Sequence, residues 1–335
     1  GGRDVLGAAA FAGSEQLHES HAHGEADIPL ARVYTPPLGE TPQMLEVWRT
    51  GAGTQPGSYG RVRYARAGDL LFGSLAVHES ELQPSERPHG TPRTRTALEL
   101  TTELAYRQMY ATLAALESPH LVRVWNYIPD INLATHGLER YRQFNTARHE
   151  VSLACGRAVA GNVPAASALG AAAGSPLTIY FLASRRAPAF IENPRQVSAY
   201  RYPPQYGPRS PAFSRATVLG EGSEAMLFIS GTASIVGHRT LHTGDPAAQT
   251  RETLANIQAL LDEAASRFGG KAPRLQTLAY KVYVRDPKDL PVIRAQLESA
   301  IGPGATPLYL KADICREDLA VEIEAVGSHG WPLAG

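Results

Sequence analysis

The chain has 335 residues, of which 43% are hydrophobic and 19% charged, and its formal net charge is zero. This length accommodates two or three domains with sizeable cores, and the composition is typical of a globular protein. Zero net charge disfavours a broad surface for nucleic acid or an anionic membrane, and no apolar run reaches the ~20 residues of a membrane span. The two cysteines, Cys155 and Cys315, form no disulfide framework, so we expect a cytoplasmic protein.

Residues 1–55 are rich in proline and glycine and have few periodic segments, so we expect an irregular N-terminal extension. Residues 56–185 form a first predicted domain, in which strands alternate with helices. Its expected elements are a strand at 69–77, a helix at 97–116, a strand at 121–128, a second helix within 129–149, and closing strands at 165–171 and 177–184.

Residues 216–335 repeat this order of elements. The expected elements are a strand at 225–235, a helix at 248–268, a strand at 278–287, a helix at 288–301 with Asp289 as its N-cap, and closing strands at 306–314 and 321–326. Two long copies indicate a duplicated domain, because solenoid repeats are shorter. The predicted fold is therefore α+β, with mixed sheets that carry helices on one face.

The linker between the copies, residues 186–215, is unusual in composition. Its part from Arg195 to Arg215 holds four arginines, three tyrosines and four prolines, and no acid. One interpretation is an irregular crossover in which proline fixes the backbone. The other is a stiff rim whose guanidinium groups bind carboxylates and whose tyrosines contact a ring, which favours a small cyclic dicarboxylate as ligand. Clefts between domains commonly hold ligands.

Two glutamates mark the last predicted strand. Glu322 and Glu324 alternate along "VEIEAV" and so share one face. Such a pair is commonly a solvated surface, but the matching strand of the first copy, "LTIYFLAS", has no acid. A glutamate partly buried at the junction would instead have a raised pKa and could act as a general acid.

The remaining candidates give weaker signals. Cys315 is by itself typical of a small buried hydrophobic residue. The small residues of "SGTAS" that follow a strand indicate close packing or a near approach of backbone to ligand. The segment His18–Glu25 is dense in histidine but lacks the spacing of a metal site, so we expect no metal.

Longer motifs make the chain resemble a known family. The second copy is similar to the Rid/YjgF superfamily, whose fold is also called chorismate-mutase-like. Five separated motifs, "VWNYIPDIN", "HGLERYRQFNTAR", "IENPRQVSAYRYPPQYGPRSPAFSRA", "FISGTASIVGH" and "CREDLAVEIEA", resemble the chorismatases. The resemblance covers residues 45–330. It implies a Rid-like trimer arrangement, pseudo-threefold, folded into one chain, with the active site between the central and C-terminal domains.

The same resemblance implies a reaction and its residues. Chorismatases cleave the enolpyruvyl ether of chorismate and release pyruvate. Glu322 matches the family's general acid, which protonates the enol-ether methylene, and Cys315 matches a second catalytic position. The residues expected to bind substrate are Arg148, Tyr202, Tyr206, Arg209, Arg215, Thr232 and Ala233.

The branches of the family differ in product. A cysteine at position 315 resembles the aromatising branches, and Ala233 in place of glycine resembles the branch that forms both 3- and 4-hydroxybenzoate. The hydrolytic branch, which forms 3,4-dihydroxycyclohexa-1,5-diene carboxylate, is the first alternative. An imine deaminase of the Rid type is less favoured, because the arginine of that family would fall near Pro307, where there is none. A binding protein without catalysis is a third alternative. We expect no cofactor, no nucleic-acid or membrane partner, and a monomer.

Overall fold

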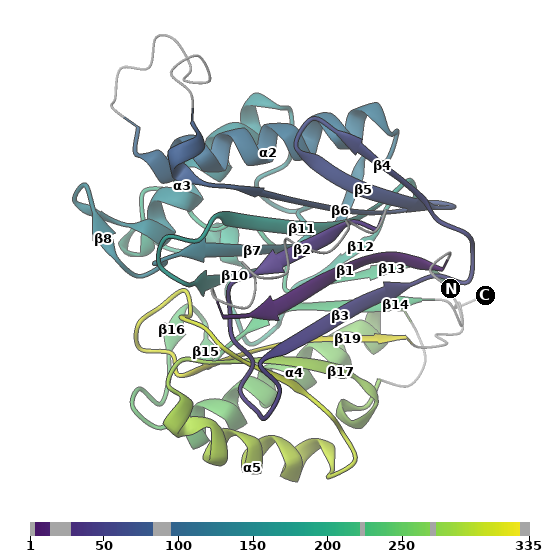
Figure 1. The fold of residues 1–335 in the computed structure, drawn as a ribbon. Coiled ribbons are helices and arrows are strands. Elements are labelled where there is room, and N and C mark those ends of the chain that lie inside the picture. The colour runs from purple at the N-terminus through teal and green to yellow at the C-terminus, as the bar shows by residue number, and fades with distance from the viewer. Residues whose placement is uncertain (1–3, 14–27, 83–94, 222–224, 269–272, 329–335) are drawn as a thin grey trace.

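The computed structural model describes residues 4–13, 28–82, 95–221, 225–268 and 273–328. Its architecture is α+β, with two six-stranded sheets, one three-stranded sheet and helices on the outer faces (Figure 1). No helix among these residues is both long and apolar enough to cross a membrane.

The first large sheet is built from residues 55–184. Its closing strands match the predicted ones residue for residue. In spatial order the strands are β10 (Ala165–Ala171), β7 (His120–Pro129), β11 (Leu177–Ser184), β6 (Leu70–Val77), β5 (Val62–Ala67) and β4 (Gln55–Tyr59).

The second large sheet has the same order of elements, which confirms the duplication. In the same spatial order as the first sheet, its strands are β18 (Leu308–Lys311), β17 (Ala279–Val284), β19 (Val321–Ser328), β14 (Met226–Thr232), β13 (Ala216–Leu219) and β12 (Ala189–Ile191). In each copy the first two strands are parallel and every other pair is antiparallel.

Two helices cover the outer face of each large sheet, α2 (Ala97–Ala115) and α3 (Arg140–Ala154) in the first copy, α4 (Pro246–Phe268) and α5 (Leu290–Ile301) in the second. The start of α2 is fixed by a capping box, in which the Thr96 hydroxyl accepts from the Glu99 amide and the Glu99 carboxylate accepts from the Thr96 amide. Asp289 occupies the N-cap position of α5 as expected, although its side chain makes no capping bond.

The N-terminal residues correct the sequence-based expectation of an irregular extension. Strands β1 (Val5–Ala12), β2 (Leu30–Val33) and β3 (Gln43–Arg49) form a small sheet in the order β2-β1-β3. Strand β1, "VLGAAAFA", is buried along its whole length. A strand buried on both faces has no polar alternation, so periodicity analysis could not detect it.

The three sheets turn their inner faces toward one shared core, with the small sheet between the two copies (Figure 1). Each sheet contributes aromatic side chains to it, among them Phe11 from β1, Tyr127 from β7 and Tyr283 from β17. This arrangement bears out the expected trimer-like organisation within one chain.

Two hairpins connect neighbouring elements, β8 (Ala134–Thr135) with β9 (Leu138–Glu139) and β15 (Ile235–Val236) with β16 (Arg239–Thr240). The linker contains two 3-10 turns, η4 (Ala199–Arg201) and η5 (Pro204–Tyr206). The other described 3-10 turns are η2 (Glu79–Glu81), η7 (Leu275–Thr277) and η8 (Pro287–Asp289). The linker also contains β12, so it is part of the second sheet as well as a crossover.

The buried small sheet leads to a prediction on stability. Phe11 is fully buried in the shared core, so Phe11→Ala is expected to lower the free energy of unfolding by about 3–5 kcal/mol. Leu133→Ala, at a half-exposed leucine, is the control and should cost less than about 1 kcal/mol. Urea unfolding followed by circular dichroism measures both. Equal, small effects would show that the N-terminal sheet does not contribute to the core.

Candidate active site

A cavity of about 530 Å³ lies where the two copies meet. The first copy contributes the segment around β8, β9 and the start of α3, and the second copy contributes β14, β19 and the loop before β19. Ser214 and Ile314 bridge to β10, which ties the linker and this loop to the first copy. The lining residues include Asn132, Glu139, Tyr141, Arg142, Tyr202, Tyr206, Phe213, Arg215, Gly231, Ala233, Cys315, Arg316 and Glu322.

The linker supplies one aromatic wall of the cavity. The rings of Tyr202 and Tyr206, held by the two 3-10 turns, lie 5.4 Å apart between centroids. The Tyr206 hydroxyl donates to the His238 carbonyl at 2.6 Å. The Arg316 guanidinium stacks over the Tyr206 ring at 4.1 Å. Prolines on either side keep this wall stiff, as the composition of the linker predicts.

Two arginines in the cavity have unused hydrogen-bond donors. Arg215 donates through Nη2 to the Val197 carbonyl and the Tyr202 hydroxyl, both at 2.8 Å, while its buried Nε has no partner. Arg316 donates through Nη1 to the His238 carbonyl at 3.0 Å, while its buried Nη2 has no partner. Within the described residues neither forms an ion pair. Unpaired guanidinium donors beside a cavity are suited to bind carboxylates.

Glu322 is buried at the base of the cavity. It projects from β19, is 4% exposed, and packs against the backbone of Gly231. A side-chain methyl group at position 231 would overlap a carboxyl oxygen of Glu322. Among the described residues its carboxyl group has no hydrogen-bond partner. Burial, reinforced by the charge of Glu324, raises the pKa of the Glu322 carboxyl to about 8. The group is therefore a neutral acid at pH 7.

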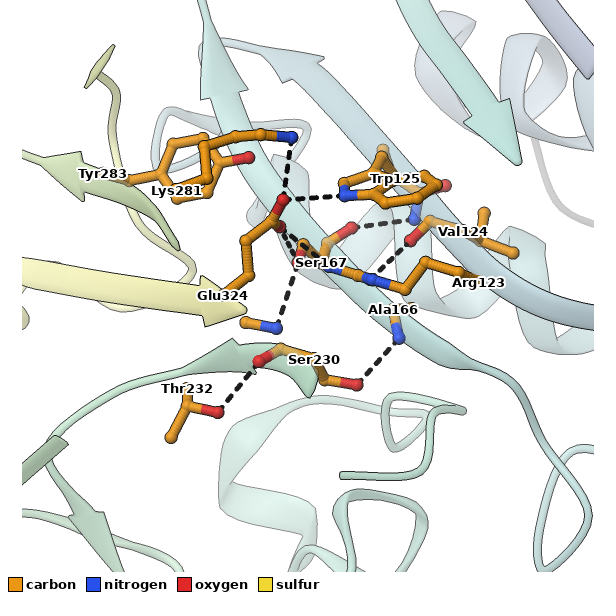
Figure 2. Close-up of polar contacts among 12 residues, drawn as sticks. Arg123, Val124, Trp125, Ala166, Ser167, Ser230, Thr232, Lys281, Tyr283 and Glu324 are labelled. Atoms are coloured by element: carbon orange, nitrogen blue, oxygen red, sulfur yellow. Dashed lines mark hydrogen bonds and ion pairs between the residues drawn. The ribbon is translucent and has the colours of Figure 1, made fainter. Parts of the chain in front are cut away.

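Glu324, two residues along the same face, has the opposite environment (Figure 2). Its carboxylate contacts Lys281 Nζ and Arg123 Nη2, both at 2.8 Å. It also accepts from Trp125 Nε1 at 2.8 Å and from the Ser167 hydroxyl at 2.7 Å. Burial alone would raise the pKa of Glu324, but the two cations outweigh it and hold the pKa below its usual value. The pair thus combines one acid and one carboxylate.

Cys315 lies in the loop between β18 and β19, beside Glu322. Burial, followed by the charge of Glu322, raises the pKa of its thiol to about 12, so the group is a thiol at neutral pH. Arg285 holds this loop, because its guanidinium donates to the carbonyls of Ile314, Arg316 and Leu319 and to the side chains of Asn132 and Asp313.

The structure places six of the predicted site residues on the cavity wall: Tyr202, Tyr206, Arg215, Ala233, Cys315 and Glu322. Arg148, Arg209 and Thr232 do not line it. Arg148 donates to Asn145 Oδ1 at 2.9 Å, Arg209 is exposed, and the Thr232 hydroxyl donates to the Ser230 carbonyl. Residue type and motif do not reveal the direction of a side chain, and the binding roles expected of these three residues stay predictions. The histidine-rich segment 18–25 lies outside the described residues.

Sequence reasoning missed Arg316, Tyr141 and Arg285. Arg316 directly follows Cys315, and its position in the same loop was the available signal. Tyr141 lies in α3, and burial raises the pKa of its phenol, so it is neutral. No local pattern points to Arg285, because its partners are distributed over three segments.

Known proteins that are similar to this chain identify its family. Residues 46–183 match the family described as the N-terminal domain of FkbO/Hyg5-like chorismatases. A 3-hydroxybenzoate synthase from Streptomyces hygroscopicus is 35% identical, over 97% of this chain and 92% of its own. The chain belongs to the chorismatase family. It is therefore an enzyme.

Further relatives agree with this membership. A chorismatase from Streptomyces rapamycinicus is 37% identical, over 96% of both chains. The crystal structure of a chorismatase, 32% identical, covers 97% of this chain and 93% of its own with a TM-score of 0.83. The chorismatase architecture thus extends over both copies and the N-terminal sheet.

The burial of Glu322 predicts how stability depends on pH. Since the folded-state pKa is about 8 and the usual value 4.5, the folded chain holds a proton that the unfolded chain releases between these values. The resulting stability is complete below pH 4.5 and is lost as pH rises through 8. From pH 5.5 to 8 the wild type should lose about 3 kcal/mol relative to Glu322→Gln, which cannot titrate.

Urea unfolding of both proteins across this pH range measures the difference. Glu298→Gln, at an exposed acid of the outer helix α5, is the control and should follow the wild type. Parallel curves for wild type and Glu322→Gln would contradict the raised pKa.

Proposed function

We propose that this chorismatase cleaves the enolpyruvyl ether of chorismate, releasing pyruvate and forming 3-hydroxybenzoate, 4-hydroxybenzoate or both, with Glu322 as the general acid. The observation that carries the proposal is a buried, neutral glutamic acid in a cavity that also offers two arginines with unused donors. The printed names of the relatives, chorismatase and 3-hydroxybenzoate synthase, agree with it.

Substrate binding uses the positive charge of the cavity. Chorismate is a ring with two carboxylates, and Arg215 and Arg316 are two cations of the wall that each retain a guanidinium N–H group without an acceptor among the described residues. The tyrosines of the linker provide a flat surface for the ring. We assign one carboxylate to each arginine, and the cavity volume of about 530 Å³ is in the range usual for small-ligand sites.

The chemical step begins with protonation of carbon. Glu322 donates its proton to the methylene of the enol ether, and the C=C electron pair forms the new C–H bond. The resulting oxocarbenium ion is released as pyruvate when the bond between oxygen and the ring breaks and its electrons stay with the pyruvyl oxygen. This cleavage leaves a ring cation that still carries its neighbouring hydroxyl group. Direct loss of the proton from the hydroxyl-bearing carbon gives 4-hydroxybenzoate, whereas 3-hydroxybenzoate requires the hydroxyl oxygen to move to the carbon that pyruvate left before the proton is lost. In both aromatic routes the proton returns Glu322 to its acid form, so no water is consumed.

The state of Cys315 bears on its role. A thiol with a pKa of about 12 is a poor base at neutral pH, which favours a contact with the ring hydroxyl over proton abstraction. The proposed steps are proton transfers and charge stabilisation by side chains of this chain. The expected monomer and cytoplasmic location stay predictions.

Glu322→Gln tests the proposal directly. Glutamine keeps the shape of the side chain but has no acidic proton, so pyruvate release from chorismate should fall by at least about 10²–10⁴-fold. Pyruvate is measured by a coupled lactate dehydrogenase assay, with Glu298→Gln, at an exposed acid of α5 that does not line the cavity, as the control of unchanged activity. Turnover near the wild-type level in Glu322→Gln would rule out the proposed acid.

Cys315→Ala tests the product assignment. Without the thiol the ring hydroxyl loses a contact and the cavity gains space for water, so we expect a larger share of the dihydroxy-cyclohexadiene carboxylate and less aromatic product. Chromatography of the products measures the ratio. The same ratio in wild type and variant would contradict the role of Cys315, and a wild type that forms only the dihydroxy acid would establish the hydrolytic alternative.

A further inference from the structure

Glu322 and Glu324 are chemically identical side chains on one face of β19, and the difference between them comes from their neighbours. In the described part of the chain, every hydrogen-bond donor to these two carboxyl groups bonds to Glu324 and none to Glu322; the donors are Lys281, Arg123, Trp125 and Ser167 (Figure 2). Ser167 also accepts from the Gly231 amide at 3.0 Å, and Gly231 is the residue that packs on the Glu322 carboxyl. The cluster around Glu324 therefore lies directly behind the proposed acid.

A third acid belongs to this cluster and comes from the N-terminal sheet. Glu46, on β3, lies 3.1 Å from Lys281 Nζ. The Tyr180 hydroxyl accepts from Lys281 at 2.9 Å and donates to Glu46 at 2.9 Å, which closes a triangle of polar contacts. The Lys281 side chain is 5% exposed, so bulk water screens this charge poorly.

The charges of this cluster balance only when Glu46 is included. Two cations, Lys281 and Arg123, face two carboxylates, Glu46 and Glu324. Without Glu46 the cluster would carry one excess positive charge behind Glu322. An excess cation favours the ionised form of a nearby carboxyl group and would draw the proton off the acid.

We propose that Glu46 is a positioning residue of the reaction: the N-terminal sheet supplies the negative charge that neutralises this cluster and so keeps Glu322 in its acid form. The inference rests on the proposed role of Glu322. It gives the small sheet a part in catalysis although it contributes no residue to the cavity wall.

The other charged and titratable groups that face the two glutamates come from the elements packed around them and are the same in the variants below. Around Glu324 these are Tyr127, Tyr180 and Tyr283, and around Glu322 they are Arg215, Arg285, Cys315 and Tyr141.

The test is the pH profile of kcat/KM for pyruvate release by Glu46→Gln. Activity needs the protonated acid, so the wild-type profile should fall as pH rises through about 8. Glutamine still accepts a hydrogen bond from Lys281 but carries no charge. The kcat/KM of Glu46→Gln should therefore fall at a pH about 0.5–1 unit lower than that of the wild type. At pH 8 the variant should have about threefold lower kcat/KM than the wild type, while the two values stay equal on the plateau at lower pH.

Two controls isolate the effect of the charge. Asp4→Asn removes an acid that directly precedes β1 and forms an exposed ion pair with Arg49 of β3, and its profile should match the wild type. Glu46→Asp keeps the charge but disturbs the packing, and its profile should return toward the wild type. A Glu46→Gln profile equal to that of Asp4→Asn, or a Glu46→Asp profile shifted as far as that of Glu46→Gln, would overturn the proposal.

A second readout does not depend on catalysis. The loss of stability between pH 5.5 and 8, compared with Glu322→Gln in the same background, should end at a lower pH and be smaller in Glu46→Gln, because only the folded-state pKa of Glu322 falls. If Glu322→Gln releases pyruvate normally, the proposed function fails, whereas this shift still reports on Glu46. No shift in the stability curve would overturn the inference on Glu46 alone.

Discussion

Strand β19 carries two carboxyl groups, each at most 5% exposed, into the junction of the two copies, and the surrounding structure has to accommodate both. Two unpaired charges at that depth would be costly, because burial penalises the ionised form. The chain resolves this by concentrating its donors on Glu324 and leaving Glu322 with none among the described residues. The result is one stable carboxylate beside one retained proton, at the base of a cavity lined by arginine and tyrosine.

The duplicated fold explains how such a junction can form in a single chain. Both copies keep their helices outside and turn the inner faces of their sheets toward each other, with the small sheet as third member (Figure 1). The copies have the same strand order, yet only the second carries acids on its third strand, β19. Equivalent positions of one fold thus serve packing in one copy and the proposed chemistry in the other.

The sequence was sufficient for the elements that have a clear period. The helix from Ala97 follows from the helical spacing of its apolar residues and the strand Leu177–Ser184 from its apolar run, and alternation correctly placed Glu322 and Glu324 on one face. Strand β1 was missed, because burial on both faces removes the alternation. The unequal states of the two glutamates could not be predicted either, since they depend on cations about 200 and about 40 residues away in the chain, Arg123 and Lys281.

Infrared difference spectroscopy of the free enzyme, titrated from pH 6 to 10, tests the central claim most directly, since it detects the proton on the buried acid without substrate or turnover. We expect a carbonyl band of a protonated carboxylic acid at pH 7 that disappears near pH 8 and is absent in Glu322→Gln. A spectrum of wild-type enzyme at pH 7 without such a band, or one whose band persists in Glu322→Gln, would contradict the account.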